Sequence, residues 1–128
     1  MSQRNRFIVC FAVTEALAFF SPCSEYFGYE FVFIAAAIGL AAVVLACVSI
    51  ALAARLQSLR EVLTAAVAFL AAPFVIGSLL ALVGTPPNVH GLAILTFLLY
   101  AAVSIIGGVI LLIVSAVRAK NERAIRNP

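Results

Sequence analysis

Long apolar runs separated by short polar segments dominate the pattern of this sequence. The clearest run extends over residues 31–54 and contains no charged side chain. Its 24 residues exceed the roughly 20 apolar residues that a helix needs to cross a bilayer. The run is also too long for a core strand and too uniformly apolar for a surface helix. The pattern therefore predicts a transmembrane helix over 31–54.

Three further apolar segments predict three more helices, at 5–21, 62–83 and 92–117. The first of them is short, whereas the other two are long enough to span a bilayer. The tail, 118–128, is polar and basic, and we expect it to fray beyond the membrane. We predict an all-α integral membrane protein with four transmembrane helices in a single domain, 1–128.

The composition favours the same class of protein. Hydrophobic residues make up 66% of the 128 residues, charged residues only 10%, and the mean hydropathy is +1.22. So few polar residues cannot cover the surface of a soluble core. The net charge of +3 does not indicate a nucleic-acid partner, because the basic residues lie between and beyond the apolar runs, where they orient helices. The expected surroundings are the lipid bilayer.

The distribution of basic residues predicts the topology. With four spans, all eight basic residues lie on one side of the membrane and none on the other: Arg4, Arg6, Arg55, Arg60, Arg118, Lys120, Arg123 and Arg126. With three spans, Arg4 and Arg6 would lie on the opposite side. Cytoplasmic loops carry the excess of lysine and arginine. We therefore predict that the protein spans an inner membrane and that both of its termini lie in the cytoplasm.

Small residues recur along 31–54 with a regular spacing. They stand at steps of 4, 3, 4, 3 and 4, at Ala35, Gly39, Ala42, Ala46, Ser49 and Ala53. In lipid, small residues allow helix backbones to approach closely, and a heptad period implies left-handed packing. The segment 92–117 carries Ser104 and Gly108 on the same pattern. We predict a left-handed bundle packed through these positions; the alternative is that alanine is simply common here.

Pro73 stands near the middle of the predicted helix 62–83. A proline has no backbone N–H, so the carbonyl of Phe69 loses its helical donor. This position therefore predicts a kink.

Glu15 is the only acidic residue within a predicted span. A charged side chain deep in a bilayer costs about 2.5–3.5 kcal/mol on insertion scales, so we expect it to face the bundle or water, or to be protonated. Counting inward from the loops places Ser78, Thr96 and Tyr100 at the same depth. Two interpretations stay open: a proton- or cation-binding carboxyl, and a structural glutamate that bonds a hydroxyl or reaches the outer interface.

No pattern of catalytic, cofactor-binding or metal-binding residues stands out. The three cysteines, Cys10, Cys23 and Cys47, form no CxxC motif, and the chain contains no aspartate. The serines have no histidine or aspartate beside them in a span, so a hydrolase is unsupported. We therefore predict a protein that is not an enzyme and that needs neither a cofactor nor a metal.

Two functions are compatible with these features. The first is a protein that acts through helix–helix interactions, as an accessory subunit or an immunity or exclusion protein, bound to another membrane protein or to its own copies through small-residue faces. The alternative is an oligomeric small transporter or channel that uses Glu15.

Overall fold

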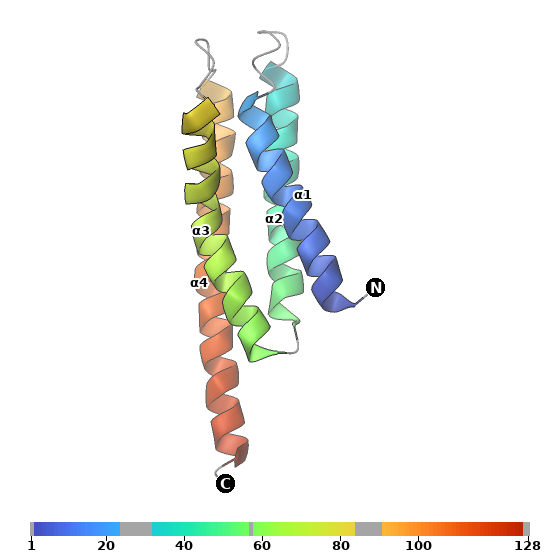
Figure 1. Ribbon diagram of the computed structural model, residues 1–128, viewed down its shortest axis with the longest axis vertical. Helices are drawn as coiled ribbons and strands as arrows, with labels where there is room; N and C mark the ends of the chain where they lie inside the picture. Colours follow the sequence, from blue (N-terminus) through green and yellow to red (C-terminus); the bar gives the residue numbers. More distant parts are fainter. Residues whose placement is uncertain (1, 24–31, 57, 84–90, 127–128) are drawn as a thin grey trace.

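The computed structural model describes residues 2–23, 32–56, 58–83 and 91–126, and these residues form four helices (Figure 1). The helices are α1 (Gln3–Cys23), α2 (Val32–Ala54), α3 (Leu59–Val83) and α4 (Gly91–Arg126). The predicted all-α class and the number of helices are confirmed for this part of the chain.

The last helix extends further than the sequence pattern predicted. We expected α4 to end near residue 117 and the tail to fray, but α4 continues to Arg126. Hydropathy marks the part of a helix that suits lipid, whereas the polar tail is itself a good helix former. It contains Ala119 and Ala124, and Glu122 stands four residues before Arg126, a spacing that stabilises a helix.

Three of the helices are long and apolar enough to cross a membrane by length and composition. Among the described residues, the candidate spans are Phe33–Ala54, Leu59–Leu82 and Leu95–Ala124. This is the arrangement of a multi-pass membrane protein. Large apolar side chains on the outside, such as Phe33 at 80% exposed and Leu82 at 84%, suit contact with lipid tails. α1, which contains Arg4, Arg6 and Glu15, is not among the candidate spans.

The helices form two hairpins that meet along α2 and α4. α1 packs mainly on α2, α3 mainly on α4, and α2 and α4 join the two pairs. α1 and α3 make few contacts with each other. We call the side of the bundle between these two helices, where Phe11, Glu15 and Phe69 lie, the α1–α3 face.

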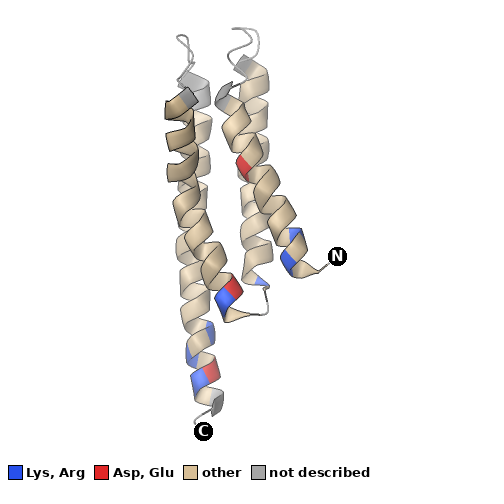
Figure 2. Cartoon of the chain, viewed as in Figure 1, with Lys and Arg blue, Asp and Glu red and all other residues tan. Residues whose placement is uncertain are grey.

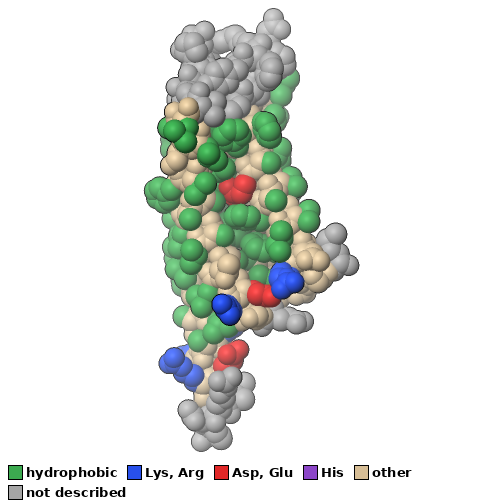
Figure 3. Space-filling view, in the orientation of Figure 1, with side chains coloured by type: hydrophobic (Ala, Val, Ile, Leu, Met, Phe, Trp, Pro, Cys, Tyr) green, Lys and Arg blue, Asp and Glu red, His purple; other side chains and the backbone are tan. Residues whose placement is uncertain are grey.

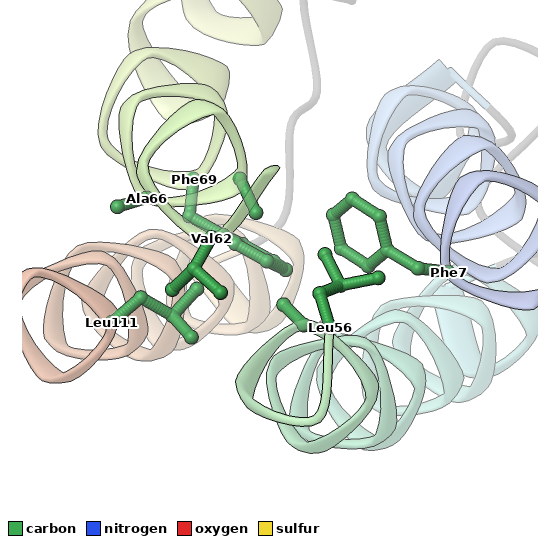
Figure 4. Close-up of a cluster of buried hydrophobic side chains, with 8 residues drawn as sticks. Phe7, Leu56, Val62, Ala66, Phe69 and Leu111 are labelled. Carbon is green, nitrogen blue, oxygen red and sulfur yellow. The ribbon is translucent and has the colours of Figure 1, made fainter. Parts of the chain in front are cut away.

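A cluster of buried apolar side chains joins the four helices near one end of the bundle (Figure 4). Phe69 of α3 is fully buried, and its ring centroid lies 5.1 Å from that of Phe11 and 6.0 Å from that of Phe7. In Figure 4, Leu56 lies near the Phe7 ring, and Leu111 of α4 lies beside Val62 of α3. The aromatic contacts hold α1 against α3 at this height even though the two helices otherwise touch little.

Basic side chains gather at the end of the bundle where α1 and α3 begin and α2 and α4 end (Figure 2). Arg118 of α4 donates hydrogen bonds to the carbonyl of Leu56 and, at 2.6 Å, to that of Ala54. The final carbonyls of a helix have no intrahelical donor and carry partial negative charge, so a guanidinium there is stabilising. Arg118 thus caps α2 and fixes it to α4.

Candidate functional site

The small-residue positions of α2 lie inside the bundle of this chain. Gly39 is buried, and the other five positions are fully buried: Ala35, Ala42, Ala46, Ser49 and Ala53. A Cβ atom at Gly39 would lie 2.8 Å from the Cβ of Thr96, so α2 and α4 approach closely there. The exposed side of α2 carries bulky residues instead, such as Leu40 and Val44. The small residues of α2 are therefore engaged by the protein's own helices.

Ser104 of α4 meets the backbone carbonyl that Pro73 leaves without a helical donor. Its hydroxyl, which is completely buried, donates to the carbonyl of Phe69 at 2.6 Å. Gly108, one turn further along α4, is also buried, and a Cβ there would lie 2.6 Å from Leu70 Cγ. α3 stays helical through Pro73; the predicted kink stays a prediction. An interhelical hydroxyl thus replaces the missing N–H.

Glu15 of α1 is paired with Tyr100 of α4. The Tyr100 side chain is 1% exposed, and its hydroxyl donates a hydrogen bond to Glu15 Oε2. Ser78, which the depth count had placed at the same height, is not part of this pair: it is exposed, and its hydroxyl donates to the carbonyl of Phe74 at 2.8 Å. Thr96 is buried and packs on Gly39. Of the three hydroxyls considered, the structure brings Tyr100 to the carboxyl.

The second oxygen of the Glu15 carboxyl group differs from the first. Oε1 is buried, yet it has no hydrogen-bond partner within the described part of the chain. Glu15 as a whole is half-buried, and acidic side-chain atoms reach the surface among green apolar atoms in Figure 3. An ionised carboxylate only accepts hydrogen bonds, whereas a protonated one can also donate. The buried Oε1 could therefore take a proton or a cation, and a donor from another molecule could reach it only if the carboxyl group turned.

Hydroxyl groups line the contact between α1 and α2. Thr14 and Ser49 are buried, their oxygens lie 3.4 Å apart, and each also bonds a carbonyl one turn earlier in its own helix. Ser21 donates to the carbonyl of Ala35 at 2.7 Å. Sequence reasoning had named Ser49 but had missed Thr14 and Ser21. The sequence signal that could have identified Thr14 and Ser21 was their position among the small residues on the side of α1 that faces α2.

A hollow opens at the basic end, between the start of α1 and the start of α3. Two neighbouring pockets of about 390 and 280 Å³ share Arg4, Leu56 and Glu61 as lining residues. Arg4 and Glu61 form an ion pair with a nitrogen–oxygen distance of 3.7 Å. Sequence reasoning had used Arg4 only as a topology signal and had given Glu61 no role, because nothing in the local pattern shows that the two helix ends face each other.

Among the described residues, no group of three or more His, Cys, Asp or Glu side chains is placed to hold a metal ion. A scan against protein-family models, a search of the curated proteins and a search of the solved structures found no match to this chain. Function is therefore inferred from the side chains and their contacts.

Proposed function

We propose that all four helices cross an inner membrane as a left-handed bundle, with both termini in the cytoplasm. The gathering of basic side chains at one end of the bundle supports this topology, and the packing of α1 along α2 supports the fourth span. In intact cells, an impermeant maleimide should not label a Ser2→Cys variant that lacks the native cysteines. Labelling of that cysteine before lysis would overturn the orientation.

We further propose that the protein acts through helix–helix interactions with another membrane protein, as an accessory subunit or an immunity or exclusion protein. The supporting observation is Glu15, a half-buried residue: one carboxyl oxygen accepts from Tyr100, and the other is buried and has no hydrogen-bond partner among the described residues. A polar group facing lipid is costly, and an adjoining helix that covers it and donates a hydrogen bond removes much of that cost.

The α1–α3 face is the surface that such a partner helix would cover. α1 is held mainly by α2 and makes few contacts with α3, so the two helices leave Glu15 partly exposed between them. The small residues of α2 are already engaged within the bundle. The proposed interaction therefore uses the α1–α3 face, and the small-residue positions serve to build the bundle that presents it.

Affinity purification of the full chain from its native membrane tests this function. We expect a different membrane protein to co-purify with the wild type and with Glu122→Ala, a control that removes an exposed carboxyl near the end of α4. Glu15→Ala should lose that partner. Purification of a defined homo-oligomer alone, or retention of the partner by Glu15→Ala, would contradict the proposal.

A second candidate, an oligomeric small transporter or channel, is supported by the unpaired Glu15 Oε1, where a proton or cation could bind. Glu15→Gln keeps the shape and removes titration, whereas Glu15→Ala removes both. If Glu15 is structural, the Gln variant should fold and function, and the Ala variant should lose about 1–3 kcal/mol of stability because Tyr100 is left unpaired. If Glu15 couples transport, the Gln variant should fold but lose proton or cation flux in proteoliposomes. A Gln variant that unfolds contradicts both roles.

A further inference from the structure

The hollow at the basic end combines an apolar wall with a charged mouth. The pocket of about 280 Å³ is lined by apolar side chains of α1, α3 and the segment between α2 and α3, namely Phe7, Ile8, Leu56, Ala65 and Ala68. Arg4, Arg60 and Glu61 are its charged lining residues. Its volume approaches the roughly 300–1,000 Å³ of sites that hold small ligands.

We propose that this hollow is a binding site for an anionic phospholipid. Arg4 and Arg60 would contact the lipid phosphate, and an acyl chain would lie along Ile8 and Ala68, nearer to the basic end than Glu15. Basic pockets between membrane helices are suited to anionic headgroups, because lysine and arginine near the bilayer surface attract them. The proposal rests on the proposed placement of the basic end at a membrane surface, and it is independent of the partner that Glu15 would bind.

The apolar wall favours a lipid over a free anion. A free phosphate is fully hydrated and gains nothing from Phe7 or Ile8, whereas burial of an acyl chain against them is favourable. Ile8 is 51% exposed, so one wall of the pocket remains open for a chain to enter from the bilayer.

Glu61 is the one lining group that opposes an anion, and its contact with Arg4 is weak. The atoms lie 3.7 Å apart, and the Arg4 side chain is 65% exposed. Ion pairs of this exposed kind contribute little to stability. A phosphate can therefore replace Glu61 as the partner of Arg4, while Arg60 supplies a second positive charge from the first turn of α3.

Native mass spectrometry of the purified full chain tests the proposal. Three probes are titrated separately: phosphatidylglycerol, phosphatidylcholine with the same acyl chains, and glycerol phosphate, which is a headgroup without chains. We expect retained phosphatidylglycerol, phosphatidylcholine binding at least about fivefold weaker, and no adduct with glycerol phosphate. Equal binding of the two lipids overturns the proposal, and so does binding of glycerol phosphate as tight as that of phosphatidylglycerol.

Charge-removing variants measure how much the basic residues at the mouth of the hollow contribute to lipid binding. Arg4→Gln and Arg60→Gln should each weaken phosphatidylglycerol binding about fivefold, the effect of one arginine near a membrane surface. Arg123→Gln, which removes an exposed arginine outside the hollow, should leave binding unchanged. An equal loss in Arg123→Gln would show general attraction to positive charge and overturn the site.

Filling the hollow gives an independent test that leaves every charge in place. Ala68→Phe should lower retention of both lipids, whereas Val67→Phe, a change of an exposed neighbour outside the hollow, should not. Unchanged binding by Ala68→Phe overturns the proposed path of the chain. Glu15→Ala should keep phosphatidylglycerol, so loss of the partner protein and loss of the lipid are distinguishable results.

Discussion

Two polar contacts inside the apolar part of the bundle differ in how completely their groups are paired. Between α3 and α4, the fully buried Ser104 hydroxyl donates to the Phe69 carbonyl, which Pro73 has deprived of its helical donor. Between α1 and α4, the Tyr100 hydroxyl donates to one oxygen of Glu15 and leaves the other oxygen without a partner in the described chain.

This difference in pairing suggests different roles for the two contacts. Ser104 gives the Phe69 carbonyl the donor that it lacks within α3, so both groups have a hydrogen-bond partner. Glu15 keeps an unpaired oxygen and partial exposure, which is costly in an apolar environment unless something else binds there. Stability is therefore expected to depend more on the Ser104 contact, and the proposed interaction with a partner more on Glu15.

The largest effect is expected at Gly108, where α3 and α4 approach closely. In Gly108→Ala, the new Cβ would lie 2.6 Å from Leu70 Cγ and 3.1 Å from the Ala66 carbonyl oxygen, and overpacking of this kind costs about 1–3 kcal/mol. Gly77→Ala is the control, since its Cβ would meet Phe97 Cζ at 3.9 Å. Unfolding in detergent, followed by circular dichroism, measures both. Equal stability of the two variants would show that the α3–α4 contact relaxes freely.

The next largest effect on stability is expected for the hydrogen bond between Ser104 and the Phe69 carbonyl. Ser104→Ala should lower stability by about 1–2 kcal/mol, because it leaves the buried Phe69 carbonyl unpaired. Pro73→Ala restores the N–H that bonds this carbonyl within α3. In a double-mutant cycle, Ser104→Ala should therefore cost clearly less in the Pro73→Ala background. Additive effects would show that Ser104 does not substitute for the missing donor.

A smaller effect is expected at the Glu15 contact. Tyr100→Phe removes the hydroxyl that donates to Glu15 Oε2 and should lower stability by about 0.5–1 kcal/mol. The half-buried carboxyl can turn toward another donor, so the loss should stay below that of Ser104→Ala. The same unfolding measurement compares the two variants. A larger loss of stability in Tyr100→Phe than in Ser104→Ala would show that the Glu15 contact contributes more to stability than the Ser104 contact.

The smallest effect is expected where hydroxyls already bond their own helix. Thr14→Val removes a 3.4 Å contact with Ser49, but Ser49 keeps its 2.8 Å bond to the Leu45 carbonyl. Interhelical polar contacts in membrane proteins average about 0.6 kcal/mol, and we expect that value or less. Unfolding of Thr14→Val and Ser49→Ala in parallel checks it. A loss as large as that of Ser104→Ala would show that the α1–α2 hydroxyls act together.

The hydropathy pattern was enough to predict the helices and much of their chemistry. Run length and apolar content set the cost of leaving a segment in water, so four helices could be placed before any contact was known. Pro73 could be recognised as the cause of an unpaired carbonyl at Phe69, because that bond joins residues four apart in one chain. The end of α4 was placed too early in the chain. Hydropathy reports suitability for lipid, and the polar tail is helical although it is not apolar.

Only the tertiary structure decided which groups meet. Depth in the bilayer left Ser78, Thr96 and Tyr100 equivalent as partners for Glu15, since depth along a helix says nothing of rotation about its axis. That rotation is set by side chains far apart in sequence: 85 residues separate Glu15 from Tyr100, and 35 separate Phe69 from Ser104. The hollow between Arg4 and Arg60 likewise exists only because the starts of α1 and α3 lie together. Local sequence fixes the energy of each helix in lipid, and packing between helices fixes which of its faces are paired.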